Sequence, residues 1–254
     1  QYLKLQAGLY DVSPSMPLAA IVNKIAKGDV AKHKITILAG WDVEKTAEYL
    51  SKKNIYTKED FLASAKKDYS DDFEFLASKP KSLGLEGYLF PDTYLIPVGA
   101  SSEGFIKVVL ANFDKKLSPE LRKKISTDKK SVFQIVTMAS ILEKEVRSLA
   151  DKKVVSGILW KRIASGMPLQ VDATINYITK KSDASASLVD IGIDSPYNTY
   201  KYYGLPKGPI SNPGMDSIMA AIYPEKSEYW FYLSAFETGE TIFSATFADH
   251  QKAI

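Results

Sequence analysis

The stretch VFQIVTMASILEKEV, residues 132–146, is the part of the chain around which we expect the fold to be built. One face of a helix over these residues carries positions at offsets of three, four and seven: Val132, Val136, Ala139, Ser140 and Glu143. A surface helix has a polar side, whereas this stretch has almost none before its last few residues. We therefore expect a buried helix that carries an acid on its buried face.

Glu143 is the acid on that face. A buried carboxylate is costly unless it is paired, hydrogen-bonded or protonated. Burial raises the pKa of a carboxyl group, which is what a general acid working near neutral pH requires. The structural alternative is that Glu143 belongs to a polar network or pairs with a lysine at the helix end. Glu145 stands about 200° further around the helix, so only one of the two acids can point into a given cleft.

The composition is that of an ordinary globular protein of 254 residues, 45% hydrophobic and 25% charged. A net charge of +3 is too small to indicate a nucleic-acid partner. The chain has no cysteine, which excludes disulfides and thiolate metal sites. His33 and His250 lie far apart in the sequence, which argues against a histidine metal site and against a Ser-His-Asp triad. We expect neither a metal nor a cofactor.

The sequence contains no run close to the roughly 18 apolar residues of a membrane span. It opens at Gln1, without a methionine, inside a predicted strand over residues 1–10. We expect that the natural N-terminus has been removed, together with any anchor or export signal.

The first third of the chain predicts a small α+β unit of short elements. Its predicted helices are 18–27, which Gly28 ends, 43–53, and 61–67, which a capping box at Thr57 introduces. A short strand is expected at 34–38. The polar residues 68–81 that follow predict a domain boundary or a lid.

The rest of the chain predicts more helices and one hairpin. The predicted helices are 102–116, 119–125, 150–165, 215–222 and 247–254. Residues 229–234 and 239–244 form the predicted hairpin, connected across 237–239. Residues 168–177 alternate in polarity, so as a strand they would present a polar row: Gln170, Asp172, Thr174 and Asn176. Such a row suits hydrogen bonds to sugar hydroxyls, and it suits a solvated edge strand equally.

Two further stretches are rich in aromatic residues. LEGYLFPDTYLIP, residues 85–97, is either an aromatic plug between two layers or a wall of a sugar-binding groove. SPYNTYKYYGLPKGPISNPG, residues 195–214, is crowded with turn formers, and loops of this kind often carry sites.

Five segments together resemble the MltG (YceG-like) family of membrane-anchored endolytic murein transglycosylases. They are LEGYLFPDTY, ASILEKEV, GMPLQVDATINY, SPYNTYKYYGLPKGPISNPG and FYLSAFETGETIFSATFADHQKAI. The resemblance runs from about residue 1 to residue 254. It implies an α+β fold, with a LysM-like N-terminal subdomain and linker over 1–80 and a YceG-like catalytic domain over 81–254. It also implies an N-terminal membrane helix, absent from this sequence, and a catalytic domain on the extracytoplasmic side of the cell membrane.

The family's catalytic glutamate lies in an EKE motif, and we place it on Glu143, in agreement with the helix geometry. The resemblance implies cleavage between N-acetylmuramic acid (MurNAc) and N-acetylglucosamine (GlcNAc), leaving 1,6-anhydro-MurNAc ends. The expected partners are peptidoglycan strands and the synthases of the elongation or division machinery. Motif membership and polarity predict these substrate-binding residues, of which the last two are the weaker candidates: Gln170, Asp172, Tyr197, Asn198, Glu86 and Tyr94.

Two alternative functions stay open. A muramidase would hydrolyse the same bond with a second carboxylate, Asp172 or Asp194, acting as the base for water. A glycan-binding cell-wall scaffold would keep the surface and lack the activity.

Overall fold

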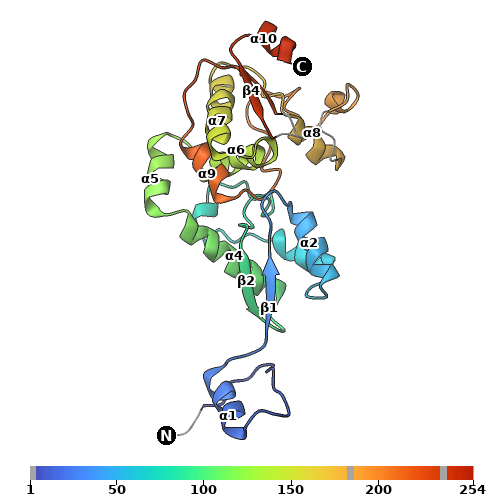
Figure 1. Cartoon of the computed structure of the whole chain (residues 1–254), viewed down its shortest axis with the longest axis vertical. Helices are drawn as coiled ribbons and strands as arrows, with labels where there is room; N and C mark the ends of the chain where they lie inside the picture. The colour runs from blue at the N-terminus through green and yellow to red at the C-terminus, as the bar shows by residue number, and fades with distance from the viewer. Residues whose placement is uncertain (1–3, 182–185, 235–238, 254) are drawn as a thin grey trace.

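The computed structural model describes residues 4–181, 186–234 and 239–253 and has a mixed α+β architecture (Figure 1). The N-terminal segment and the C-terminal helix α10 (Phe247–Ala253) lie at opposite ends of the long axis. The predicted α+β class is confirmed. No helix within the described ranges is both long enough and apolar enough to cross a membrane.

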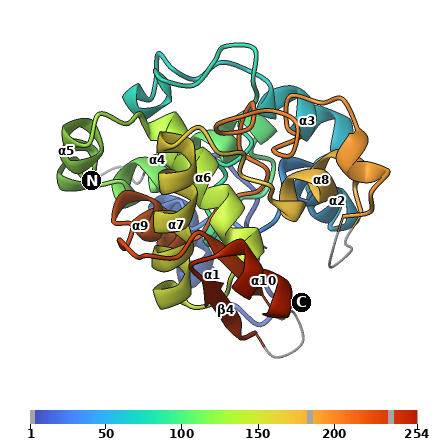
Figure 2. The same cartoon turned by 90° about the horizontal axis from the view of Figure 1, so that it is seen from above.

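Helix α6 (Val132–Glu145) forms the centre of the upper half. It begins at a capping box in which Ser131 and Gln134 satisfy each other's backbone N–H groups. Every residue from Ile135 to Leu142 is buried, as the apolar pattern predicted. The helix packs on α9 (Met215–Ile222), α7 (Leu149–Ala164), α8 (Asp172–Thr179) and α5 (Pro119–Thr127), and Figure 2 shows α7 and α8 on opposite sides of it.

The lower half combines a two-stranded sheet with three helices. Strand β1 (Lys32–Thr36) pairs antiparallel with β2 (Thr93–Pro97), so that Ile35 lies opposite Tyr94. Helix α2 (Val43–Lys52) packs on α3 (Lys58–Ala65), and α3 packs on α4 (Ser102–Lys116). The domain boundary predicted at residue 80 therefore falls between two strands of one sheet.

The polar segment 68–81 is packed into the protein. It contains the short 3₁₀ helix η1 (Glu74–Leu76), and it buries Tyr69, Phe75 and Leu76 in the same core as the sheet. Its polar composition predicted a boundary or a lid because these three apolar side chains are outnumbered by charges.

The N-terminal segment is loosely attached by comparison. Its helix α1 (Leu18–Lys27) has the predicted bounds and ends at Gly28, whose φ of 67° is left-handed, but none of its residues is buried. The strand predicted over residues 1–10 is wrong for the described residues 4–10, which form no ladder. An alternating pattern needs a neighbouring strand, and this segment has only isolated backbone bonds such as Gln6 N–H to Ile25 O. The LysM-like subdomain stays a prediction.

The strand predicted over 168–177 is also wrong, since helix α8 begins at Asp172. Thr174, expected on a polar face, is buried and shares a hydrogen bond with Thr199. The closing hairpin is confirmed, with β3 (Phe231–Ser234) paired to β4 (Thr241–Ser244). Most of its predicted turn, 237–239, lies outside the described residues. A second 3₁₀ helix, η2 (Asp190–Gly192), precedes the loop 195–214.

Candidate active site

Glu143 lies in the last turn of α6, where the N-terminus of α9 meets it. Its Oε2 accepts hydrogen bonds from Ser217 Oγ at 2.6 Å, from Gly214 N at 3.0 Å and from Lys152 Nζ at 3.4 Å. Gly214 is the N-cap residue of α9, so the carboxylate also lies at the positive end of that helix. Three donors from α7 and α9 therefore hold one oxygen of the Glu143 carboxyl group in place.

All three contacts use the same oxygen. The other, Oε1, has no hydrogen-bond partner among the residues that the structure describes. The Glu143 side chain keeps 13% of its surface accessible, against 7% for Lys152. This arrangement fixes the carboxyl group in position and leaves one oxygen available to a ligand.

The loop that precedes α2 passes beside the Glu143 side chain at Gly40. Gly40 has a φ of 78°, and a Cβ built on it would lie 3.9 Å from Glu143 Cγ. Asn212 holds the loop, since its backbone O accepts from Gly40 N and its Nδ2 donates to Trp41 O, both at 2.9 Å. The loop before α2 is therefore held close to the end of α6, and at Gly40 it has no side chain to occupy the space beside Glu143.

Glu145 faces different elements, as its angular position on the helix predicted. The hydroxyl of Tyr232 on β3 donates to Glu145 Oε2 at 2.9 Å. The backbone N–H of Ala173, near the start of α8, lies close enough to lower the pKa of the same carboxyl group. Burial raises the pKa of Glu145 to about 7, and the nearby Asp172 contributes in the same direction.

The predicted substrate-binding residues are dispersed. Asp172, the first residue of α8, accepts a hydrogen bond from the Tyr200 hydroxyl. Gln170 is exposed and has a left-handed backbone with a φ of 53°. Asn198 is fully buried, and its Nδ2 donates to Ile191 O and Ile193 O at 2.9 and 2.7 Å. The Asn198 side chain therefore holds its own loop together.

Tyr94 is buried on β2, where its hydroxyl donates to Phe90 O at 2.6 Å and accepts from Asn112. This environment favours the aromatic plug over the sugar-binding wall for that residue. Asp194, the other base considered for a muramidase, is exposed and interacts with Lys201 and Tyr202.

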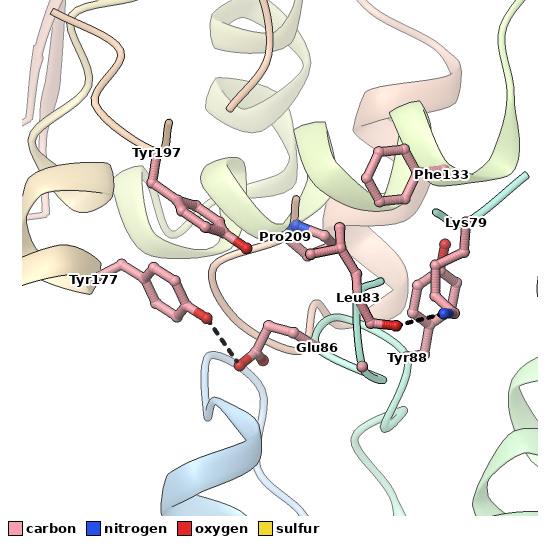
Figure 3. Close-up of a pocket in the computed structure, with 9 residues that line it drawn as sticks. Lys79, Leu83, Glu86, Tyr88, Phe133, Tyr177, Tyr197 and Pro209 are labelled. Carbon is pink, nitrogen blue, oxygen red and sulfur yellow. Dashed lines mark hydrogen bonds between the residues drawn. The ribbon is translucent and has the colours of Figure 1, made fainter. Parts of the chain in front are cut away.

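Glu86 and Tyr197 are brought together in one cavity of about 120 Å³ (Figure 3). The remaining walls come from several elements: Lys79, Leu83, Gly84, Tyr88, Phe133, Tyr177 and Pro209. Both carboxyl oxygens of Glu86 lie 3.2 Å from Val43 N, and the Tyr177 hydroxyl is 3.5 Å from Glu86 Oε2. Burial raises the pKa of Glu86 to about 8. Its carboxyl group is therefore largely protonated at neutral pH.

The groups that hold Glu143, and one wall of the cavity, were not predicted from the sequence. Gly214 and Ser217 carry a detectable signal, because a glycine followed by a short apolar helix indicates a helix N-terminus that can receive a carboxylate. Lys152 and Tyr177 carry no such signal in the sequence, since only the tertiary fold brings α7 to Glu143 and α8 to the cavity. The described residues contain no group of three or more histidine, aspartate or glutamate side chains that could hold a metal ion.

Fold and site together define a mixed α+β protein with one glutamate anchored through a single oxygen at the junction of two helices. The model of the YceG-like family matches residues 1–254, so the chain belongs to that family.

Its relatives include proteins of known name and structure. The chain is 34% identical to the endolytic murein transglycosylase of Bacillus subtilis (strain 168), over 98% of this chain and 72% of that protein. It is 30% identical to the protein of the same name from Streptococcus pneumoniae serotype 2, and it spans about half (51%) of that protein's length. The crystal structure of a YceG-like protein from Listeria monocytogenes superposes with a TM-score of 0.80 at 34% identity, covering 98% of this chain and 85% of that one.

Proposed function

We propose that this protein is an endolytic murein transglycosylase that cleaves the MurNAc–GlcNAc bond within glycan strands. The names of its relatives support the substrate and the reaction class. The observation that carries the proposal is the anchoring of Glu143 through Oε2 alone, which leaves Oε1 available for proton transfer.

In the proposed reaction Glu143 acts first as an acid and then as a base. Protonated Glu143 donates its proton to the glycosidic oxygen as the bond from that oxygen to C1 of MurNAc breaks. The positive charge that develops at C1 is stabilised by the N-acetyl group of the same sugar. The C6 hydroxyl then bonds to C1 and returns a proton to the carboxylate, which leaves a 1,6-anhydro-MurNAc end. The reaction consumes no water.

The contacts around Oε2 suit this role because they strengthen as charge develops. Ser217, Gly214 and Lys152 donate to an oxygen that becomes negative when Glu143 releases its proton. Donors already in place stabilise such a charge without reorganising. Glu145 accepts a hydrogen bond from Tyr232 on the other side of α6, away from the contacts of Glu143, and we assign it no catalytic step.

The location and partners of the protein are part of the same proposal. Peptidoglycan lies outside the cytoplasmic membrane, so the domain would act on the extracytoplasmic side, held there by a membrane anchor. The synthases that extend glycan strands supply the polymer that this reaction cuts, and we propose them as partners.

A digest of purified peptidoglycan tests the function and its acid together. Mass spectrometry of products from the wild-type chain should show anhydro-MurNAc ends, which are lighter by one water than the ends left by hydrolysis. Glu143→Gln should lower the rate by about 10²- to 10⁴-fold, the usual contribution of a general acid. The matched control is Glu59→Gln, which changes an exposed glutamate on α3. Reducing ends from the wild type would indicate a muramidase, and intact strands would favour the scaffold.

A further inference from the structure

We propose that the cavity beside Glu86 is a subsite that holds the acetamido group of one sugar of the glycan strand. The inference rests on the proposed function, since both sugars of peptidoglycan carry an acetamido group. It adds the part of the substrate that the protein recognises away from Glu143.

The size and walls of the cavity suit a small group with a methyl end. Its volume of about 120 Å³ far exceeds the roughly 10–15 Å³ that a cavity needs to hold one water. Leu83, Phe133 and Pro209 contribute apolar surface. The rings of Tyr177 and Tyr197 lie with their centroids 5.1 Å apart and form a further wall. A methyl group would be removed from water against these side chains.

The polar groups of the cavity suit an amide. Figure 3 shows the carboxyl group of Glu86 and the hydroxyls of Tyr177 and Tyr197 around the same space. A protonated carboxyl group offers one donor and one acceptor, which match the carbonyl and the N–H of an amide. The ammonium of Lys79 already donates to Leu83 O at 2.6 Å and to Pro80 O at 3.3 Å, so it requires no anion from the ligand.

The charge state of Glu86 depends on the groups that face it. Burial is the main cause of its raised pKa, and the carboxylate of Asp42 before α2 acts in the same direction. Lys180 after α8 and the backbone N–H groups of Val43 and Gly87 act in the opposite direction. Tyr177 and Tyr197 are neutral in this range because the pKa of each hydroxyl is raised by burial. The Glu86 carboxyl group is therefore mostly neutral at pH 7 and half ionised near pH 8.

A glycine keeps part of the cavity open. A Cβ added at Gly208 would lie 3.0 Å from Leu83 Cδ1, 3.3 Å from the Tyr197 hydroxyl and 3.8 Å from Phe133 Cζ. These three side chains all line the cavity. Gly208→Ala would thus place a methyl group among them without removing any polar group.

Binding of a defined oligosaccharide tests the proposal. The probe is tetra-N-acetylchitotetraose, titrated by NMR into the full chain carrying Glu143→Gln. Cellotetraose is the comparison ligand, because it is neutral, of equal length, and has hydroxyls in place of the acetamido groups. We expect cellotetraose to bind at least about tenfold more weakly than the probe. Gly208→Ala should weaken probe binding about tenfold, and Tyr197→Phe severalfold.

The control for these variants is Gly192→Ala, which adds a methyl group where nothing lies within 4 Å and should leave the affinity unchanged. The pH dependence gives a separate readout. Between about pH 6.5 and pH 9.5 the affinity should fall about tenfold as Glu86 ionises. In Glu86→Gln the affinity for the probe should be the same at both pH values, because a carboxamide keeps a donor and an acceptor throughout this range.

Equal affinity for the two tetrasaccharides, or an unchanged affinity in Gly208→Ala, would overturn the subsite. Failure of the subsite is distinguishable from failure of the proposed function. If the wild type produces anhydro ends while the probe shows no acetamido preference, the function stands without the subsite. If the acetamido preference is present and peptidoglycan stays intact, the subsite stands and the function falls.

Discussion

Glu143 and Glu145 are two residues apart on α6, yet they contact different elements. Glu143 is held by donors from α7 and α9 and keeps one oxygen without a partner in the described part of the chain. Glu145 accepts a hydrogen bond from Tyr232 on β3 and lies near the start of α8. Helical geometry separates the two faces, and the sequence could predict that much. It could not predict which groups each carboxyl group contacts, because Lys152, Ser217 and Tyr232 arrive through the tertiary fold.

Glu145 makes a testable contribution to the pH dependence of stability. Its pKa in the folded protein, about 7, lies above the ordinary value of 4.5, so between these values the folded state keeps a proton that the unfolded chain releases. The stabilisation is complete below about pH 4.5 and is lost as the pH rises through about 7, and the shift corresponds to roughly 3 kcal/mol. In Glu145→Gln the free energy of unfolding should therefore fall less between pH 5 and pH 8.

Urea denaturation at the two pH values measures this difference. Glu59→Gln, on the surface of α3, is the matched control and should show the wild-type dependence. A dependence in Glu145→Gln as steep as that of the wild type would show that Glu145 does not titrate between these values. Glu86 also has a raised pKa, so some dependence should persist in the single variant.

At the scale of elements, helices with local signals were predicted well. Helices α1 and α9 have the predicted bounds, because their apolar stripes end at residues that stop a helix. Helix α8 was mistaken for a strand. Its N-cap Val171 makes no side-chain cap bond. A helix without a side-chain cap leaves no local start signal in the sequence to detect.

Packing between elements gives a second prediction, at Gly157 on α7. A Cβ there would lie 1.8 Å from Glu225 O, and the Glu225 segment is bound to α7 through a 2.9 Å bond from its N–H to Lys153 O. Alanine is favoured over glycine within a helix by about 1 kcal/mol. The clash with backbone should outweigh this, so Gly157→Ala should lower the free energy of unfolding by roughly 1–3 kcal/mol. Chemical denaturation measures this difference, with Gly192→Ala as a control that should leave the free energy of unfolding nearly unchanged. A Gly157→Ala variant more stable than the wild type would contradict the close contact between α7 and Glu225.

At the scale of the whole molecule, the sequence predicted the α+β class and a division at residue 80, and the structure suggests a second place to divide the chain. Residues 4–31 extend away from the rest in Figure 1, and α1 buries none of its residues. The polar segment 68–81 attracted the predicted boundary instead, although Phe75 and Leu76 belong to the main core. Composition shows where charges gather, whereas a boundary depends on which contacts cross it.

Two truncated chains distinguish a boundary at residue 80 from one at the end of the N-terminal segment 4–31. A chain starting at Asp29 keeps β1 paired with β2, and Ala31 O still accepts from Val98 N, so it should unfold cooperatively within a few degrees of the full chain. A chain starting at Lys81 loses β1, α2 and α3 and with them the buried side chains of Ile35, Leu50 and Phe61. Each large core side chain contributes about 2–5 kcal/mol, so losing these three costs about 6–15 kcal/mol, as much as the 5–15 kcal/mol that stabilises a typical domain. Thermal unfolding followed by circular dichroism should therefore show a transition for the first chain and none for the second. A cooperative transition in the chain starting at Lys81 would place the boundary at residue 80 after all, and the pairing of β1 with β2 would then be an interdomain contact.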